Sequence, residues 1–140
     1  MIRSRVLEKL ESAGNFSLLV EIYLAENELD LALAALERVN PEIWMDRMSV
    51  LRGKVAQAVE IPRPREAIRQ YLLLAESLIE QRNRGSYAEA ARFLQQVHKL
   101  YQGLGEIDHW RRIFGGFTRD YQRLPALKDE FRRAGLLDSN

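Results

Sequence analysis

Residues 16–39 place apolar side chains at the spacing of two short amphipathic helices joined by a tight turn. The first helical face follows the i, i+3, i+4, i+7 spacing with Phe16, Leu19, Val20 and Tyr23. After a polar turn at residues 25–28, a second face follows with Leu29, Ala32, Leu36 and Val39. Small Ala32 and Ala35 fit a close helix–helix approach. This pattern predicts the hairpin of a stackable helical repeat, which is an interaction scaffold and not an active site.

Glycine and proline interrupt similar helical periodicity along the rest of the chain. The breaks fall at Gly14, Pro41, Pro62-Arg63-Pro64, Asn83, Gly103-Leu104-Gly105 and Gly135. No segment alternates with period two over a strand's length. The sequence therefore predicts an all-α protein of about eight helices, with its strongest break at Pro62-Arg63-Pro64.

Internal similarity favours a solenoid over a bundle. Segments that begin at Glu66 and at Tyr87 repeat the order of residues 31–39, with small side chains early and large ones late. Such units cannot bury their apolar faces alone, so neighbouring units stack. We predict a right-handed α-solenoid of antiparallel helices, similar to tetratricopeptide repeats, that forms one domain over residues 1–140 within a larger protein or complex.

Composition argues against catalytic and metal chemistry. The chain has no cysteine, so it lacks thiolate nucleophiles, disulfides and cysteine zinc sites. His98 and His109 lack the spacing of paired metal ligands and have no nucleophile at mechanistic spacing. We therefore expect no enzyme activity and no catalytic residue, metal or cofactor. No run of residues has the length and apolarity of a membrane span, and residues 1–5 do not begin a signal peptide, so we expect a cytoplasmic protein.

Charge is distributed unevenly, although the net charge is only +1. Residues 1–60 contain 7 Lys and Arg against 10 Asp and Glu, whereas residues 61–140 contain 14 against 10. The arginines of the second half suggest an alternative function as a nucleic-acid accessory module. A dedicated nucleic-acid domain is usually far more basic, so this alternative is not favoured.

Three local features allow a functional or a structural interpretation. Basic residues could form a surface for phosphate or acidic peptide, or they could be solvated side chains paired with nearby glutamates; they are Arg63, Arg65, Arg69, Arg82, Arg84 and Arg92. Aromatic residues could form a stacking platform, but their helical spacing favours the core; they are Trp44, Tyr71, Tyr87, Tyr101 and Trp110. Gly115-Gly116 could cradle a phosphate, although close packing or a helix kink is favoured.

A family resemblance rests on motifs between Ala67 and Leu127. They are Ala67-Ile68-Arg69-Gln70-Tyr71, residues 83–91, Leu100-Tyr101, Leu104-Gly105, Trp110 and residues 121–127. In these segments the chain resembles the helical C-terminal region of bacterial SWIM zinc-finger proteins, a family that joins this region to an N-terminal Cys/His zinc motif. The resemblance implies either the separate helical half of such a protein or a stand-alone relative. Zinc and nucleic-acid binding transfer to no residue here, because the chain has no cysteine.

Repeat scaffolds bind partners through the concave face, so we expect a protein or peptide partner. The candidate partner-binding residues are Arg47, Arg52, Gln70, Gln95 and Arg112. The apolar residues of the first and last helical segments predict self-association through a terminal helix.

Overall fold

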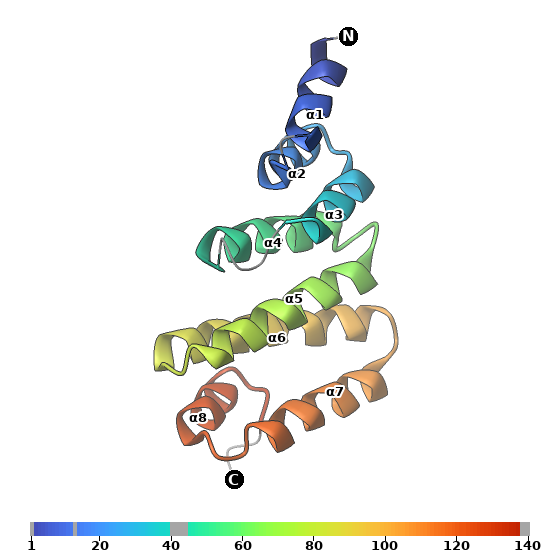
Figure 1. The fold of residues 1–140 in the computed structure, drawn as a ribbon. Coiled ribbons are helices and arrows are strands. Elements are labelled where there is room, and N and C mark those ends of the chain that lie inside the picture. The colour runs from blue at the N-terminus through green and yellow to red at the C-terminus, as the bar shows by residue number, and fades with distance from the viewer. Residues whose placement is uncertain (1, 13, 40–44, 138–140) are drawn as a thin grey trace. The chain divides into compact units, whose positions relative to one another are not determined.

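The computed structural model describes residues 2–12, 14–39 and 45–137. These residues form eight α-helices and no strand (Figure 1). The helices are α1 (Ile2–Ser12), α2 (Phe16–Ala25), α3 (Leu29–Glu37), α4 (Met45–Val59), α5 (Pro64–Glu80), α6 (Arg84–Gly103), α7 (Ile107–Asp120) and α8 (Pro125–Arg133). The all-helical prediction is therefore confirmed. No helix in the described part of the chain is long and apolar enough to cross a bilayer.

Helix ends occur where the sequence supplies caps. The side chain of Asn15 accepts a hydrogen bond from the backbone N–H of Leu18, and that of Asn83 accepts one from Ser86. Each bond satisfies one of the free N–H groups in the first turn of a helix. After α6, Gly105 has a φ of +72°, a left-handed conformation that suits glycine. These caps account for the short turns between the helices.

The chain divides into two compact units, Met1–Arg63 (unit 1) and Pro64–Asn140 (unit 2). The division falls within Pro62-Arg63-Pro64, the strongest break expected from the sequence. A proline disfavours helical conformation in the residue before it, so one continuous helix cannot cross this segment. A single repeat domain over residues 1–140 stays a prediction.

In unit 1, α2 packs against α1, α3 and α4. Ala32 and Leu36 of α3 are completely buried, as is Val20 of α2. Two ion pairs fasten the surface of this unit. Arg38 donates to Glu11 at 3.0 Å and lies over the ring of Phe16, and Arg63 donates two hydrogen bonds of 3.2 Å to Asp30.

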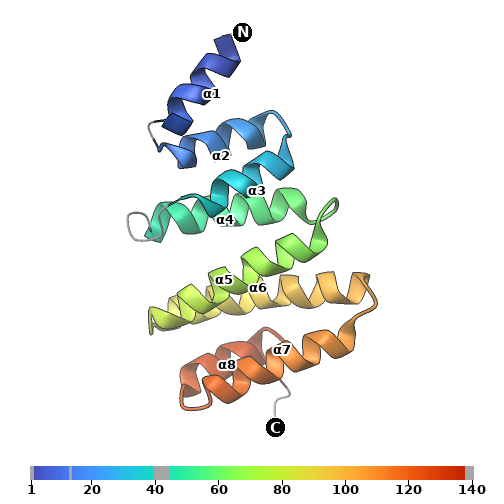
Figure 2. The same ribbon diagram turned by 45° about the vertical axis from the view of Figure 1, so that its right-hand side comes forward.

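In unit 2, α5 and α6 lie side by side, and α6 also contacts α7 and α8 (Figures 1 and 2). Both helices have buried small residues, Ala67 and Ala75 on α5 and Ala90 and Ala91 on α6. Small side chains allow helix backbones to approach closely.

Aromatic residues fill the core of unit 2. Trp110 stacks on Phe114 with ring centroids 5.0 Å apart, and Phe114 meets the ring of Phe131 edge-on at 5.2 Å. Tyr71, Tyr87, Tyr101 and Trp110 are buried, which confirms the core interpretation over an exposed stacking platform for these residues. Trp44 lies outside the described residues.

Gly115 and Gly116 lie inside α7 and do not interrupt it. A Cβ atom added at Gly115 would meet no heavy atom within 4 Å, and one at Gly116 would meet only the Arg119 guanidinium, at 3.8 Å. Close packing therefore does not explain these glycines, and this part of the expectation was wrong. They do not form a phosphate-cradling loop either, because the segment is helical. The other part of the expectation, a helix kink, stays a prediction.

Ala32→Leu tests the close packing of α3 in unit 1. The alanine is completely buried, so three added carbon atoms must displace neighbouring side chains. We expect a loss of ~1–3 kcal/mol in the free energy of unfolding, measured by chemical denaturation. An unchanged denaturation midpoint would contradict the tight packing at this position.

Gly115→Ala tests the glycine in the interior of α7. Alanine restricts the unfolded chain and meets no obstacle in the folded one, so we expect a gain of about 1 kcal/mol. Gly105→Ala is the control, because its φ of +72° should make the same substitution destabilising. Denaturation curves that shift in the same direction for both variants would refute this account.

Candidate functional site

The five predicted partner-binding residues are divided between the two units. Arg47 and Arg52 belong to α4 of unit 1. The side chain of Arg47 lies outside the described residues, and Arg52 is partly buried. Gln70, Gln95 and Arg112 belong to α5, α6 and α7 of unit 2. Arg112 is exposed.

The two glutamines of this set are buried or hydrogen-bonded within the fold. Gln70 lies in the buried stripe of α5 between Ala67 and Leu74, and its exposed fraction is 0%. Its assignment to an exposed partner surface is therefore corrected. Gln95 is partly buried, and its side-chain amide donates a 2.6 Å hydrogen bond to the carbonyl oxygen of Ala134 at the end of α8. Since the last carbonyls of a helix lack partners within it, this bond satisfies one of them and joins α8 to α6.

An ion pair between an arginine and a glutamate connects the start of α5 to the start of α7. Arg65 donates two hydrogen bonds, of 2.9 and 2.8 Å, to the two carboxylate oxygens of Glu106. Bidentate guanidinium–carboxylate pairs have a fixed geometry, so this pair orients both helix ends. The hydrogen bonds from Arg65 lower the pKa of Glu106, and burial opposes them only in part.

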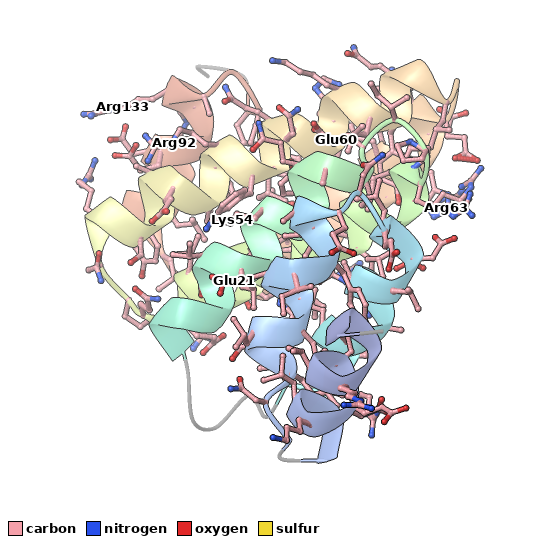
Figure 3. All side chains as sticks on the ribbon, turned by 90° about the horizontal axis from the view of Figure 1, so that it is seen from above. Glu21, Lys54, Glu60, Arg63, Arg92 and Arg133 are labelled. Atoms are coloured by element: carbon pink, nitrogen blue, oxygen red, sulfur yellow. The ribbon has the colours of Figure 1, made fainter. Side chains whose placement is uncertain are left out.

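A second set of ion pairs, between one arginine and two carboxylates, connects the start of α6 to α8. Nη1 of Arg84 donates to Asp129 at 2.8 Å and to Glu130 at 3.0 Å. Glu130 is buried, and a buried carboxylate needs such a partner. Arg133, labelled in Figure 3, adds a contact of 3.3 Å to Asp129. The hydrogen bond from Arg84 is the main cause of the lowered pKa of Asp129.

These contacts divide the arginines that sequence analysis grouped together. Arg65, Arg69 and Arg84 are paired with carboxylates of unit 2, and Arg63 is paired with Asp30 of unit 1. Paired guanidiniums contribute less positive potential to a surface, so the structural interpretation applies to these residues. Arg82 and Arg92 differ from the other arginines of this group because they make no close ion pair with a carboxylate of the described residues. Arg82 has only a 4.0 Å contact with Glu80, and Arg92 has no partner among the described residues.

A pocket of about 350 Å³ lies in unit 2, where the α5–α6 turn meets the segment between α7 and α8. The lining residues are Arg82, Arg119, Asp120, Tyr121, Gln122, Arg123 and Leu124. The hydroxyl of Tyr121 donates a 3.2 Å hydrogen bond to Glu80 and so joins the two segments. Burial and this hydrogen bond raise the pKa of Tyr121, so the phenol stays protonated and remains a donor at neutral pH.

The pocket is cationic. Its lining contains three arginines and one carboxylate, that of Asp120. Arg119 and Arg123 have no ion-pair partner among the described residues, which distinguishes them from Arg65 and Arg84. Guanidinium groups recognise carboxylate and phosphate through paired N–H donors. Chemically, the arrangement suits the binding of an anion.

Arg82 belongs to the basic residues singled out from the sequence, whereas Arg119 and Arg123 do not. The two missed arginines lie four residues apart, around the end of α7. Arg82 belongs to a different turn, so only the tertiary structure brings these residues to one pocket. One local signal was available, because Arg82 occupies the turn after α5, where glycine or asparagine is usual.

Comparisons with known proteins add little to this geometry. No protein-family model matches the chain, and no solved structure is significantly similar to it. One relative is the "Uncharacterized protein YwqB" of Bacillus subtilis (strain 168), 38% identical over 60 residues. The match covers 43% of this chain and 11% of that protein, so the matched segment is a small part of the relative. Among the described residues, no group of three or more His, Asp or Glu side chains could hold a metal ion.

Glu106→Gln tests the pair between α5 and α7. The pKa of Glu106 is lowered in the folded state, so its carboxylate stabilises the fold at pH values above the unfolded-state pKa of ~4.3. This stabilisation is lost as the pH falls through the lower pKa of the folded state. We expect the variant to be less stable than the parent at pH 7, and the difference to shrink steadily below about pH 4.3. Denaturant titrations at several pH values measure this difference.

Glu89→Gln is the control for that experiment, because Glu89 is exposed on α6 and has no partner among the described residues. Its removal should leave the pH dependence of stability close to that of the parent. A Glu106→Gln profile parallel to that of the parent would show that the pair does not stabilise the fold.

Proposed function

We propose that this protein is a non-catalytic helical-repeat scaffold that binds another protein. In this proposal the helices form antiparallel hairpins of a right-handed, tetratricopeptide-like solenoid. The observation that carries it is the order of helix contacts within each unit. The main contacts join consecutive helices, such as α2 with α3 and α5 with α6, or helices two apart, such as α2 with α4 and α6 with α8. Contacts restricted to near neighbours in the chain are typical of repeat arrays.

Side-chain sizes support the same proposal. Ala32 and Ala35 of α3, and Ala90 and Ala91 of α6, are buried, and so are the larger Leu36 of α3 and Leu94 of α6. A helix hairpin in a repeat array buries its small residues against its partner helix and stacks its larger residues on the next unit. The partner surface then includes exposed polar residues, of which Arg112 on α7 belongs to the set predicted from sequence.

Self-association through a terminal helix is part of the proposal for unit 1. Val6 of α1 is 45% exposed, whereas Leu127 and Phe131 of α8 are buried. The exposed Val6 supports α1 over α8 for this role. The localisation proposed is cytoplasmic, and the resemblance to the helical region of SWIM zinc-finger proteins is proposed as the family relationship.

Co-purification tests the scaffold function. A tagged full-length chain, expressed in the cells that naturally make it, should retain a partner protein at mild ionic strength. Charge reversal by Arg112→Glu should reduce the amount retained. The same change at Arg92, which is exposed on α6 (Figure 3), is the control and should leave the partner bound.

The nucleic-acid alternative predicts a different result. Phosphate-backbone contacts make affinity fall steeply as salt increases, and nuclease treatment removes the ligand. Material that is retained only without nuclease and is released by moderate salt would replace the scaffold proposal with that alternative. The pairing of Arg65, Arg69 and Arg84 with carboxylates counts against it.

A further inference from the structure

The pocket between the α5–α6 turn and the α7–α8 segment has more cationic groups than its own carboxylate neutralises. Arg82, Arg119 and Arg123 line it, against Asp120. Among the lining residues the excess equals two positive charges, and Glu80, 4.0 Å from Arg82, offsets part of it. A phosphate monoester carries about −1.5 to −2 charges at pH 7, whereas one carboxylate carries a single charge. The charge of the pocket therefore matches a phosphoryl group better than a single carboxylate.

The guanidiniums of the pocket are available as donors. Arg119 and Arg123 have no hydrogen-bonded or ion-paired partner among the described residues. Arg82 reaches Glu80 only at 4.0 Å, and Glu80 already accepts a hydrogen bond from Tyr121. Elsewhere in unit 2, Arg65 and Arg84 hold carboxylates at 2.8–3.0 Å. The arginines of the pocket are thus among those that make no close ion pair within the described part of the fold.

The backbone at Arg82 gives an independent indication. Its φ is +58°, in the left-handed region that is unfavourable for most residues with a Cβ atom. Asn27 has the same φ in the turn after α2, where asparagine is a usual choice. Glycine at position 82 would relieve the cost. The presence of arginine there is explained if its side chain has a function that outweighs the lost stability.

A simpler interpretation is that the arginines balance helix dipoles. Arg82 follows α5 and Arg119 belongs to the last turn of α7, and cations are favourable at such ends. This effect does not require an arginine in the left-handed region, and it does not explain Arg123, which lies beyond the end of α7. The N-cap residue of α8, Leu124, also lines the pocket and offers no side-chain acceptor to the first N–H groups of that helix. Helix N-termini with free N–H groups favour phosphate.

We propose that this pocket of unit 2 binds a phosphoryl group, and that Arg82, Arg119 and Arg123 are the residues that hold it. The volume of about 350 Å³ exceeds what a phosphate ion needs and lies at the lower end of the range of small-ligand pockets. The group is therefore expected to be a monoester, carried either by a phosphorylated side chain or by a small free phosphate. The proposal rests on residues of unit 2 and does not depend on the scaffold function.

NMR titration of the full chain tests the proposal. At constant ionic strength, inorganic phosphate and phosphoserine should shift the amide signals of Arg82, Arg119, Tyr121 and Arg123 and saturate in the millimolar range. Serine, acetate and chloride should not. Absent or unsaturable shifts, or equal shifts with acetate, would overturn the proposal.

The Arg82→Gly variant separates binding from folding. Glycine suits the left-handed conformation, so the variant should melt a few degrees above the parent, by ~2–6 °C. The same variant should bind phosphoserine about tenfold more weakly, because a charge-assisted hydrogen-bond donor is lost. A variant that is more stable than the parent and binds equally well would exclude a role for Arg82 in phosphate binding.

Matched substitutions complete the test. Arg119→Gln and Arg123→Gln should each weaken phosphoserine binding about tenfold. Arg92→Gln removes the same charge from an exposed position of unit 2 outside the pocket and should leave binding unchanged (Figure 3). If Arg92→Gln weakens binding as much as the pocket variants do, the binding reflects net charge and the proposed site is wrong.

Two further ligands distinguish the sources of the phosphoryl group. A short peptide with one phosphoserine should bind more tightly than free phosphoserine if the site recognises a phosphorylated protein. A mononucleoside monophosphate should bind more tightly than either if the site recognises a small free ester. Either result supports a phosphoryl site, provided that Arg82→Gly and Arg119→Gln weaken the binding of that ligand. If the parent and the variants bind both ligands equally, the proposed phosphoryl site is wrong for both sources.

Discussion

Helix α6 is the element on which unit 2 depends, because it contacts α5, α7 and α8. Its buried face changes from small residues, Ala90 and Ala91, to larger ones, Leu94 and Val97. Small residues allow a neighbouring helix to approach closely, and larger ones fill wider spaces between helices. The other three helices of the unit all contact α6. The pocket depends on α6 as well, since it forms where the segments before α6 and before α8 meet.

Arginine has two roles in unit 2, and position on the helix separates them. Arg65 and Arg84 lie in the first turns of α5 and α6. Arg65 reaches the carboxylate just before α7, and Arg84 reaches carboxylates on α8. They connect helices that are distant in the sequence. Arg82, Arg119 and Arg123 lie at or after helix C-termini. Arg82 has only the 4.0 Å contact with Glu80, and Arg119 and Arg123 have no ion-pair partner among the described residues. Because the arginines of the first group are paired with carboxylates, the basic second half of the chain need not bind nucleic acid. The arginines of the second group concentrate positive charge at the pocket.

Local sequence was sufficient to predict the helices but not the site. Helix positions follow from apolar spacing and from breakers such as Pro64 and Gly105, whose effects extend over only a few residues. Gln70 was placed wrongly because a glutamine in a helix is usually exposed, and only the packing around α5 shows that this one lies in the buried stripe. The pocket could not be predicted, since Arg82 and Arg123 become neighbours only through the packing of separate turns.

The turn after α5 shows how a structural requirement and a site can compete for the same residues. Asparagine tolerates the left-handed conformation best after glycine, and Asn83 is adjacent to the position that needs it. Asn83 is instead extended and caps α6 through Ser86, so the left-handed conformation falls on Arg82. The cap explains why residue 82 is left-handed, but it does not explain why that residue is an arginine. A glycine would suit the backbone of the turn better, and a cation at the end of α5 does not require an arginine in the left-handed region. The cationic pocket beside the turn gives the arginine side chain a further function.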